Sequence, residues 1–217
     1  MKIYLKSYLA ENFGDDLFIK ILMQRYPNHK FYAISDGFDN YSKKYSNLKV
    51  YSNRFLFKLI GKFKLEKYLA NKCDLVLTLG GSMFIENSIK DKDREFAIGK
   101  NKQYILGANF GPYITKEYFE NARNDFEKAE DVCFREKYSY ELFKDLPNVR
   151  HAPDIAFLTD VSKVKSKNSK KVVISVIDCE QRKSKECREN YENKIIEMIS
   201  FFDRLGYEIT LASLCKY

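Results

Sequence analysis

Strand-like and helix-like segments alternate along almost all of this 217-residue chain, and this alternation constrains the fold more than any other feature. Residues 74–79 (Asp-Leu-Val-Leu-Thr-Leu) form a short apolar run typical of a buried strand. Residues 17–26 instead carry apolar side chains at helical spacing until Pro27 ends the helix. Alternating strands and helices predict βαβ units with right-handed crossovers. The expected fold is therefore α/β, with a Rossmann-like and mostly parallel sheet.

The same patterns predict the other elements of the first 160 residues. Strands are expected at residues 3–8, 30–35, 48–51, 74–79, 102–106, 131–134 and 149–151, with an extended piece at 155–158. Helices are expected at residues 17–26, 55–69, 115–129 and around 139–143.

Composition changes after Asp160, where residues 162–171 include five lysines and three serines. Such a stretch predicts an exposed linker. Beyond it, one βαβ unit is expected, with a strand at 172–177, a helix at 189–205 and a strand at 206–212. One such unit is too small to bury a parallel sheet on both faces. We therefore expect a domain at 1–160, a linker at 161–171, and at 172–217 the first βαβ unit of a second, truncated α/β domain.

Charge and composition narrow the function classes. The net charge of +8 favours anionic partners such as phosphorylated metabolites, nucleic acid or an acidic membrane surface, although no dedicated nucleic-acid arm is present. The five cysteines have none of the short spacings of a zinc site or redox dithiol, and no segment approaches the ~18 apolar residues of a membrane span. We expect a cytoplasmic protein without metal, associated at most peripherally with the inner face of the membrane.

Five clusters rich in glycine, carboxylate or arginine each follow a predicted strand. They are residues 12–15 (Asn-Phe-Gly-Asp), 80–84 (Gly-Gly-Ser-Met-Phe), 107–112 (Gly-Ala-Asn-Phe-Gly-Pro), 135–139 (Arg-Glu-Lys-Tyr-Ser) and 154–157 (Asp-Ile-Ala-Phe). In an open α/β sheet, the carboxyl ends of the strands form the crevice where ligands bind. We therefore expect one ligand-binding rim, assembled from distant parts of the sequence.

Glycines and an arginine give this rim its clearest ligand signals. Gly80 and Gly81 would let an anion or sugar approach the backbone, and Ser82 can cap the next segment, although neither a dinucleotide fingerprint nor a P-loop is complete. Arg135 lies at a strand end, where a guanidinium suits bidentate binding of carboxylate or phosphate. The alternative for Arg135 is a salt bridge with Glu136 or Asp154. The 107–112 cluster fits either a rigid turn or a ligand contact.

Helix starts offer further candidates. Asp15 or Asp16 is expected to cap the first helix, with Asn12 and the free amides of its first turn available to a ligand. Ser139 is expected to cap its own helix. Neither His29 nor His151 has a catalytic partner that the sequence reveals, so the catalytic residue stays unassigned.

Taken in order, the five clusters resemble the polysaccharide pyruvyl transferase family. Its pattern is Asn-x-Gly-Asp, Gly-Gly-Ser-x-Phe, Gly-x-x-x-Gly-Pro, Arg-Asp/Glu-x-x-Ser and Pro-Asp-x-Ala-Phe, matched here at residues 12–15, 80–84, 107–112, 135–139 and 153–157. The resemblance implies a glycosyltransferase-B-like protein with two Rossmann-like halves around a ligand cleft. It also implies transfer of the enolpyruvyl carbons of phosphoenolpyruvate onto two hydroxyls of a sugar, forming a ketal in surface polysaccharides.

The resemblance also implies roles for particular residues. Arg135 would grip the carboxylate or phosphate of phosphoenolpyruvate. The cleft would be lined by Gly80, Gly81 and Ser82, with Asn12, Asp15 and Asp154 at its rim. Phosphoenolpyruvate would be the donor without any cofactor, and the acceptor a sugar or lipid-linked saccharide. Family members usually carry an Arg-x-His block in the second domain, the natural place for a general acid, and the sequence shows none before Tyr217.

Two other function classes compete with this one. A glycosyltransferase that uses a nucleotide-sugar would fit the same architecture, since fold does not fix function. A basic module for RNA or anionic lipid would fit the net charge and the lysines of 162–171, and predicts a steep salt dependence. The pyruvyl transferase interpretation accounts for all five clusters, and it includes no nucleic-acid partner.

Overall fold

The structure is a computed structural model that describes residues 1–9, 12–35, 40–52, 55, 57–58, 61–88, 91, 96–162, 170–177 and 184–213. It divides into two compact units, Met1–Thr159 and Asp160–Tyr217, which are taken separately below. The first unit ends one residue before the expected boundary at 160. That the second unit is the start of a truncated domain stays a prediction.

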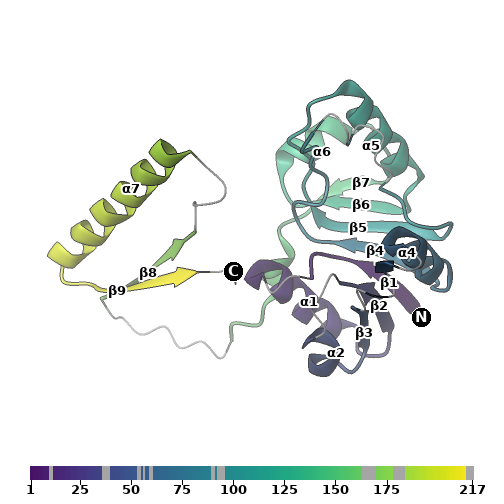
Figure 1. Ribbon diagram of the computed structural model, residues 1–217, viewed down its shortest axis with the longest axis horizontal. Helices are drawn as coiled ribbons and strands as arrows, with labels where there is room; N and C mark the ends of the chain where they lie inside the picture. Colours follow the sequence, from purple (N-terminus) through teal and green to yellow (C-terminus); the bar gives the residue numbers. More distant parts are fainter. Residues whose placement is uncertain are drawn as a thin grey trace. The chain divides into compact units, whose positions relative to one another are not determined.

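A seven-stranded parallel sheet forms the centre of the first unit, in the order β3-β2-β1-β4-β5-β6-β7 (Figure 1). The strands are β1 (Lys2–Lys6), β2 (Lys30–Ile34), β3 (Leu48–Tyr51), β4 (Leu75–Leu79), β5 (Lys102–Ala108), β6 (Asp131–Phe134) and β7 (Val149–His151). The helices are α1 (Phe13–Arg25), α2 (Asn40–Lys44), α4 (Lys62–Asn71), α5 (Lys116–Lys128) and α6 (Lys137–Phe143), followed by the 3-10 helix η2 (Ile155–Leu158). The predicted strand–helix alternation and parallel sheet are confirmed.

The strand order shows where the sheet changes direction, which is where sheets of this kind bind ligands. The chain runs outward from β1 to β3, crosses back to β4 on the other side of β1, and continues to β7. Ligands of open α/β sheets bind beyond the carboxyl ends of the strands where this direction reverses. The reversal here lies between β1 and β4; residues 12–15 follow β1 at the start of α1, and residues 80–84 follow β4.

Alternate residues of the strands point to opposite faces of the sheet. Ile3, Leu5 and Phe31 pack with Phe18 and Ile19 of α1 in one buried cluster. On the opposite face, Phe126 of α5 and Phe143 of α6 lie with ring centroids 5.0 Å apart and join Phe134 of β6. Figure 1 shows α1 and α2 beside β1–β3, and α5 and α6 beside β5–β7.

Two element predictions are wrong. The helix expected at 55–69 is not continuous: the described residues 55, 57 and 58 are helical, but Gly61 has a positive φ of 81° that a helix does not adopt, and α4 begins after it at Lys62. Residues 56, 59 and 60 lie outside the described chain. Residues 155–158, expected as an extended piece, form the 3-10 helix η2. The carboxylate of Asp154 accepts a hydrogen bond from the Ala156 amide (2.8 Å) and so caps this turn.

Two helix caps also differ from the prediction. Asn12, not Asp15 or Asp16, caps α1, its Oδ1 accepting from the Gly14 amide at 3.0 Å. Glu136, not Ser139, caps α6, its carboxylate accepting from the amides of residues 138 (2.8 Å) and 139 (3.1 Å). Each true cap lies earlier in the chain, which leaves Asp15 and Ser139 inside the helix with side chains available for other contacts.

The second unit is one βαβ unit made of β8 (Lys171–Val176), α7 (Lys185–Arg204) and β9 (Glu208–Ser213), with β8 and β9 parallel. Ile174 is buried, but α7 has no buried residue, and Met198, Phe201 and Leu205 are exposed. The strand–helix–strand prediction is confirmed, while most of the predicted lysine-rich linker lies outside the described residues. Among those that are described, no helix has both the length and the apolarity needed to cross a membrane.

Candidate functional site

Arg135 and Gly81 meet at the carboxyl edge of the first unit's sheet. Arg135 directly follows β6, and Gly81 follows β4. A Cβ atom on Gly81 would overlap the Arg135 guanidinium, with Nη1 only 2.7 Å away. The second glycine of the Gly-Gly pair is therefore explained by close approach of an arginine, and not by a ligand alone.

The Arg135 guanidinium has two partners. Its Nη1 forms a salt bridge with Asp154 Oδ2 at 2.9 Å, and its Nη2 donates to Asn109 Oδ1 at 3.1 Å. The salt bridge weighed as an alternative is present with Asp154, whereas Glu136 caps α6. A guanidinium has five N–H donors, and two of them bond to described side chains. With 29% of the side chain exposed, the group can still bind an anion.

Asp15 approaches the same place from the first turn of α1. Its Oδ1 lies 3.2 Å from the position that a Cβ atom on Gly80 would occupy. Burial raises the pKa of Asp15 from 3.8 to about 6; the charge of Asp16 adds to the rise, and that of Arg135 opposes it. A carboxyl group with this pKa is mostly ionised at neutral pH, yet close to taking up a proton.

Two polar residues of this edge did not stand out from the sequence as individual candidates. Asn109 donates its amide to the Gly81 carbonyl at 2.9 Å and binds Arg135 with its side chain; it lies within the predicted 107–112 cluster. Ser7 follows β1, and its buried Oγ has no hydrogen-bond partner among the described residues. That oxygen is 3.9 Å from a Cβ built on Gly80. No local pattern distinguishes such a serine from any other.

The loops after β4 and β5 are held side by side. Gly111 donates its amide to the Phe84 carbonyl at 2.8 Å, and the buried Ser139 hydroxyl accepts from the Phe110 amide at 2.7 Å. A Cβ on Gly107, which has φ of 69°, would lie 2.6 Å from Ile155 Cδ1. The 107–112 cluster is thus a packed turn that also contributes Asn109.

The other predicted site residues lie around the same edge. Asn12 caps α1, with its Oδ1 bonded to Gly14. Ser82 is exposed in a bend after Gly81 and does not start a helix. The five clusters thus supply, in one place, two glycines, one arginine, two carboxylates and one amide: Gly80, Gly81, Arg135, Asp15, Asp154 and Asn109. Which of them bind a substrate stays a prediction.

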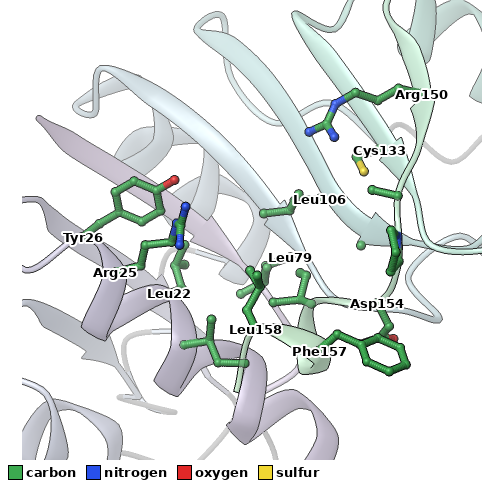
Figure 2. A pocket seen from close by; sticks show the side chains of 15 residues that line it. Leu22, Arg25, Tyr26, Leu79, Leu106, Cys133, Arg150, Asp154, Phe157 and Leu158 are labelled. Carbon is green, nitrogen blue, oxygen red and sulfur yellow. The ribbon is translucent and has the colours of Figure 1, made fainter. Parts of the chain in front are cut away.

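A cavity of about 470 Å³ opens beside this cluster. Figure 2 shows Leu22 and Arg25 of α1 and the adjoining Tyr26 on one side, and Phe157 and Leu158 of η2 below. The sheet contributes Leu79, Leu106 and Arg150. Asp154 belongs both to this wall and to the Arg135 salt bridge. The cavity is mostly apolar, so it differs in character from the charged edge next to it.

Metal binding finds no support in the part of the chain that is described, where no three His, Cys, Asp or Glu side chains gather. His151 is exposed, with its ring 6.1 Å from that of Tyr140. The chemistry available at the edge is therefore anion binding by a guanidinium, hydrogen bonding by an amide, and proton exchange by a carboxyl group.

Solved structures of Anabaena HepE are similar to this chain. The complex with UDP has a TM-score of 0.58 at 12% identity, covering 98% of this chain and 68% of HepE. The complex with UDP-glucose has a TM-score of 0.55 at 12% identity, covering 100% and 69%. At this identity the likeness shows the fold, and the predicted glycosyltransferase-B-like α/β class is confirmed.

Sequence comparison adds the family. No curated protein matches the chain as a relative. The family model for polysaccharide pyruvyl transferase matches residues 12–217, which include all five clusters around the carboxyl edge. The chain belongs to the polysaccharide pyruvyl transferase family.

Proposed function

We propose that this protein transfers the pyruvyl group of phosphoenolpyruvate onto two hydroxyls of a sugar, forming a ketal during surface polysaccharide synthesis. The observation that carries the proposal is the convergence of the family's sequence blocks on the Arg135 guanidinium. Arg135 lies over Gly81 and contacts Asn109 and Asp154, which come from three further blocks. Scattered blocks that meet at one cation support a shared role in binding an anionic substrate.

Phosphoenolpyruvate suits this cation because it carries a carboxylate and a phosphate on adjacent carbon and oxygen atoms. A planar guanidinium binds either group through paired hydrogen bonds. Anion binding would draw on the donors of Arg135 that are not engaged by Asp154 and Asn109. Glycine at positions 80 and 81 leaves the backbone beside the guanidinium without Cβ atoms of its own.

The acceptor that fits the edge is a sugar or a lipid-linked saccharide. Carboxylate and amide oxygens, as on Asp15, Asn109 and Asp154, accept hydrogen bonds from sugar hydroxyls. Exposed aromatic rings follow the same strand ends, Tyr8 after β1 and Phe157 in η2, and these can pack against the apolar faces of a saccharide. A cytoplasmic reaction, with the acceptor presented at the inner membrane face, is part of this proposal.

Titration calorimetry separates this function from its two competitors. Phosphoenolpyruvate should bind, and Arg135→Ala should weaken that binding by at least about 10- to 100-fold, the effect of losing a charge-assisted hydrogen bond. UDP-glucose binding without phosphoenolpyruvate binding would favour a nucleotide-sugar glycosyltransferase. Affinity for RNA that falls steeply with salt would favour the basic binding module.

A matched variant controls for charge. Arg150→Ala removes an arginine that is also paired with an aspartate, Asp131 at the start of β6. Arg150 lines the neighbouring apolar cavity, but its guanidinium is bound to Asp131 and not to Asp154 or Asn109. The variant should leave phosphoenolpyruvate affinity unchanged. Equal losses for Arg135→Ala and Arg150→Ala would mean that net charge, and not the Arg135 site, attracts the ligand.

A further inference from the structure

Pyruvyl transfer needs a proton donor, and the roles above do not supply one. The C3 methylene of phosphoenolpyruvate must become a methyl group, so a proton has to reach that carbon. Arg135 cannot give up a proton under physiological conditions, and Asp154 is held in a salt bridge at 2.9 Å. Within the described part of the chain, the candidates for this donor are the carboxyl groups near Arg135 that can hold a proton while an anion is bound.

Asp15 is placed for this role by geometry. It lies in the first turn of α1, which Asn12 fixes by capping. Its Oδ1 is directed at the bare backbone of Gly80, beside the Gly81 over which Arg135 lies. The charges that act on it are those of Arg135 and Asp16, and Asp16 accepts a hydrogen bond from the Tyr41 hydroxyl at 2.6 Å.

The other carboxylates near this edge are already bonded: Glu136 caps α6, and two aspartates have side-chain partners. Asp154 binds Arg135, and Asp16 binds Tyr41. The described residues give the Asp15 carboxyl charge interactions with Arg135 and Asp16 and no hydrogen bond. The nearby Ser7 Oγ is buried and has no hydrogen-bond partner among them. The edge therefore holds one uncommitted carboxyl next to its cation.

Anion binding would drive a proton onto this group. The pKa of Asp15 already stands at about 6, so about one tenth of the carboxyl is protonated at pH 7. A bound carboxylate and phosphate bring further negative charge, and they also occupy the Arg135 charge that opposes the rise. Both effects raise the pKa of Asp15 further and favour its protonated form.

We propose that Asp15 is the general acid that protonates the C3 methylene carbon of bound phosphoenolpyruvate; this rests on the proposed function. The double-bond electron pair takes the Asp15 proton to form the methyl group, which leaves an oxocarbenium carbon at C2. The first sugar hydroxyl oxygen bonds to C2, and its proton returns to the Asp15 carboxylate. The second hydroxyl oxygen then replaces phosphate at C2. The C2–O bond electrons leave with phosphate, which also carries away the second hydroxyl proton.

Proton uptake on ligand binding tests this role without relying on activity. Phosphoenolpyruvate is titrated at pH 7 into the full chain in two buffers of different ionisation enthalpy, which gives the number of protons taken up. On binding phosphoenolpyruvate, the wild-type chain should take up at least about half a proton more than the Asp15→Asn variant does. Glu127→Gln, which neutralises an exposed carboxylate of α5, should behave as the wild type does.

Kinetics provides the second measurement. Asp15→Asn should lower kcat about 100- to 10,000-fold, the usual contribution of a general acid, while phosphoenolpyruvate binds as well or better because a negative charge is gone. Thermal melting checks that the variant is folded. Equal proton uptake in wild type and Asp15→Asn, or unchanged kcat, would overturn the role of Asp15 alone. If wild-type chain does not bind phosphoenolpyruvate at all, the proposed function fails instead.

Discussion

Two arginine–aspartate pairs in the first unit have the same composition and the same sequence separation of 19 residues, but different geometry. Arg150 of β7 binds Asp131 of β6 through two parallel contacts, Nε to Oδ1 at 2.7 Å and Nη2 to Oδ2 at 3.0 Å. Arg135 divides its guanidinium between Asp154 and Asn109, with one contact to each.

The difference separates a structural pair from a binding group. The Arg150 fork matches the Asp131 carboxylate, so neither side chain has a strong reason to seek another partner. Hydrogen bonding to Asp131 raises the pKa of Arg150 accordingly. Arg135 lies at the carboxyl edge over a glycine, and 29% of its side chain is exposed, against 51% for Arg150. Some of its N–H donors are not used by Asp154 or Asn109. The setting at the end of the strands, and not the residue pair itself, marks the candidate site.

Substitution of Gly81 by alanine tests the role of Arg135 in this comparison, and we expect it to have the largest effect, on phosphoenolpyruvate affinity. The new Cβ would displace the flexible Arg135 guanidinium while leaving the backbone in place, because the overlapping atoms belong to a side-chain end. We expect phosphoenolpyruvate affinity to fall about 10- to 100-fold, measured by calorimetry, with little change in melting temperature. Wild-type affinity in Gly81→Ala would show that the position of Arg135 does not matter for binding.

Removal of the Ser139 hydroxyl should have the next largest effect, on the free energy of unfolding. Ser139 is fully buried, and its Oγ accepts from the Phe110 amide at 2.7 Å, which joins α6 to the loop that carries Asn109. Ser139→Ala leaves that amide unsatisfied and should lower the free energy of unfolding by about 2 kcal/mol in urea denaturation. Ser200→Ala on the exposed side of α7 is the control, and an equally small effect of both would contradict the account.

Asp15→Asn should stabilise the protein at neutral pH. The folded-state pKa of about 6 lies above the usual 3.8, so between these values the folded state binds more protons than the unfolded state. Stability therefore falls as pH rises from about 4 to 6, and the penalty is complete above pH 6. Asn removes the penalty, which should raise the unfolding free energy at pH 7 by about 1–2 kcal/mol, with the gain vanishing toward pH 4. A destabilised variant at pH 7 would contradict this.

Arg150→Ala should have the smallest effect. An exposed salt bridge contributes about 1 kcal/mol or less, so the unfolding free energy should change by no more than this. Phosphoenolpyruvate affinity should not change. A stability loss much larger than the loss for Arg135→Ala would show that the two pairs have been assigned the wrong roles.

Sequence patterns located the site better than they assigned its parts. The strand ends could be predicted because apolar runs and glycines mark them, and parallel topology brings such ends to one edge. Side-chain partners could not be predicted in this way. Asn12, Asp15 and Asp16 can each cap a helix, and which of them caps α1 depends on where the helix begins. Because α1 begins at Phe13, about one turn earlier than expected, the cap is Asn12.

Long-range contacts account for the residues that the sequence did not single out. Asn109 matters because it bridges Gly81 and Arg135, which are 28 and 26 positions away, and nothing local to it signals this. Ser7 becomes a candidate only because its hydroxyl is buried beside Gly80, which the sequence does not show. The salt bridge of Arg135 was foreseen as an alternative to ligand binding, and the geometry is compatible with both.

One spectrum can test the central claim, that the carboxyl edge around Arg135 is the phosphoenolpyruvate site. The Nε–Hε resonances of Arg135 and Arg150 in the ¹⁵N-labelled chain are assigned with Arg135→Lys and Arg150→Lys, and phosphoenolpyruvate is then titrated in. The account predicts a saturating shift of the Arg135 resonance while that of Arg150 stays in place. A shift of Arg150 equal to or larger than that of Arg135, or saturation that leaves Arg135 unmoved, would contradict it.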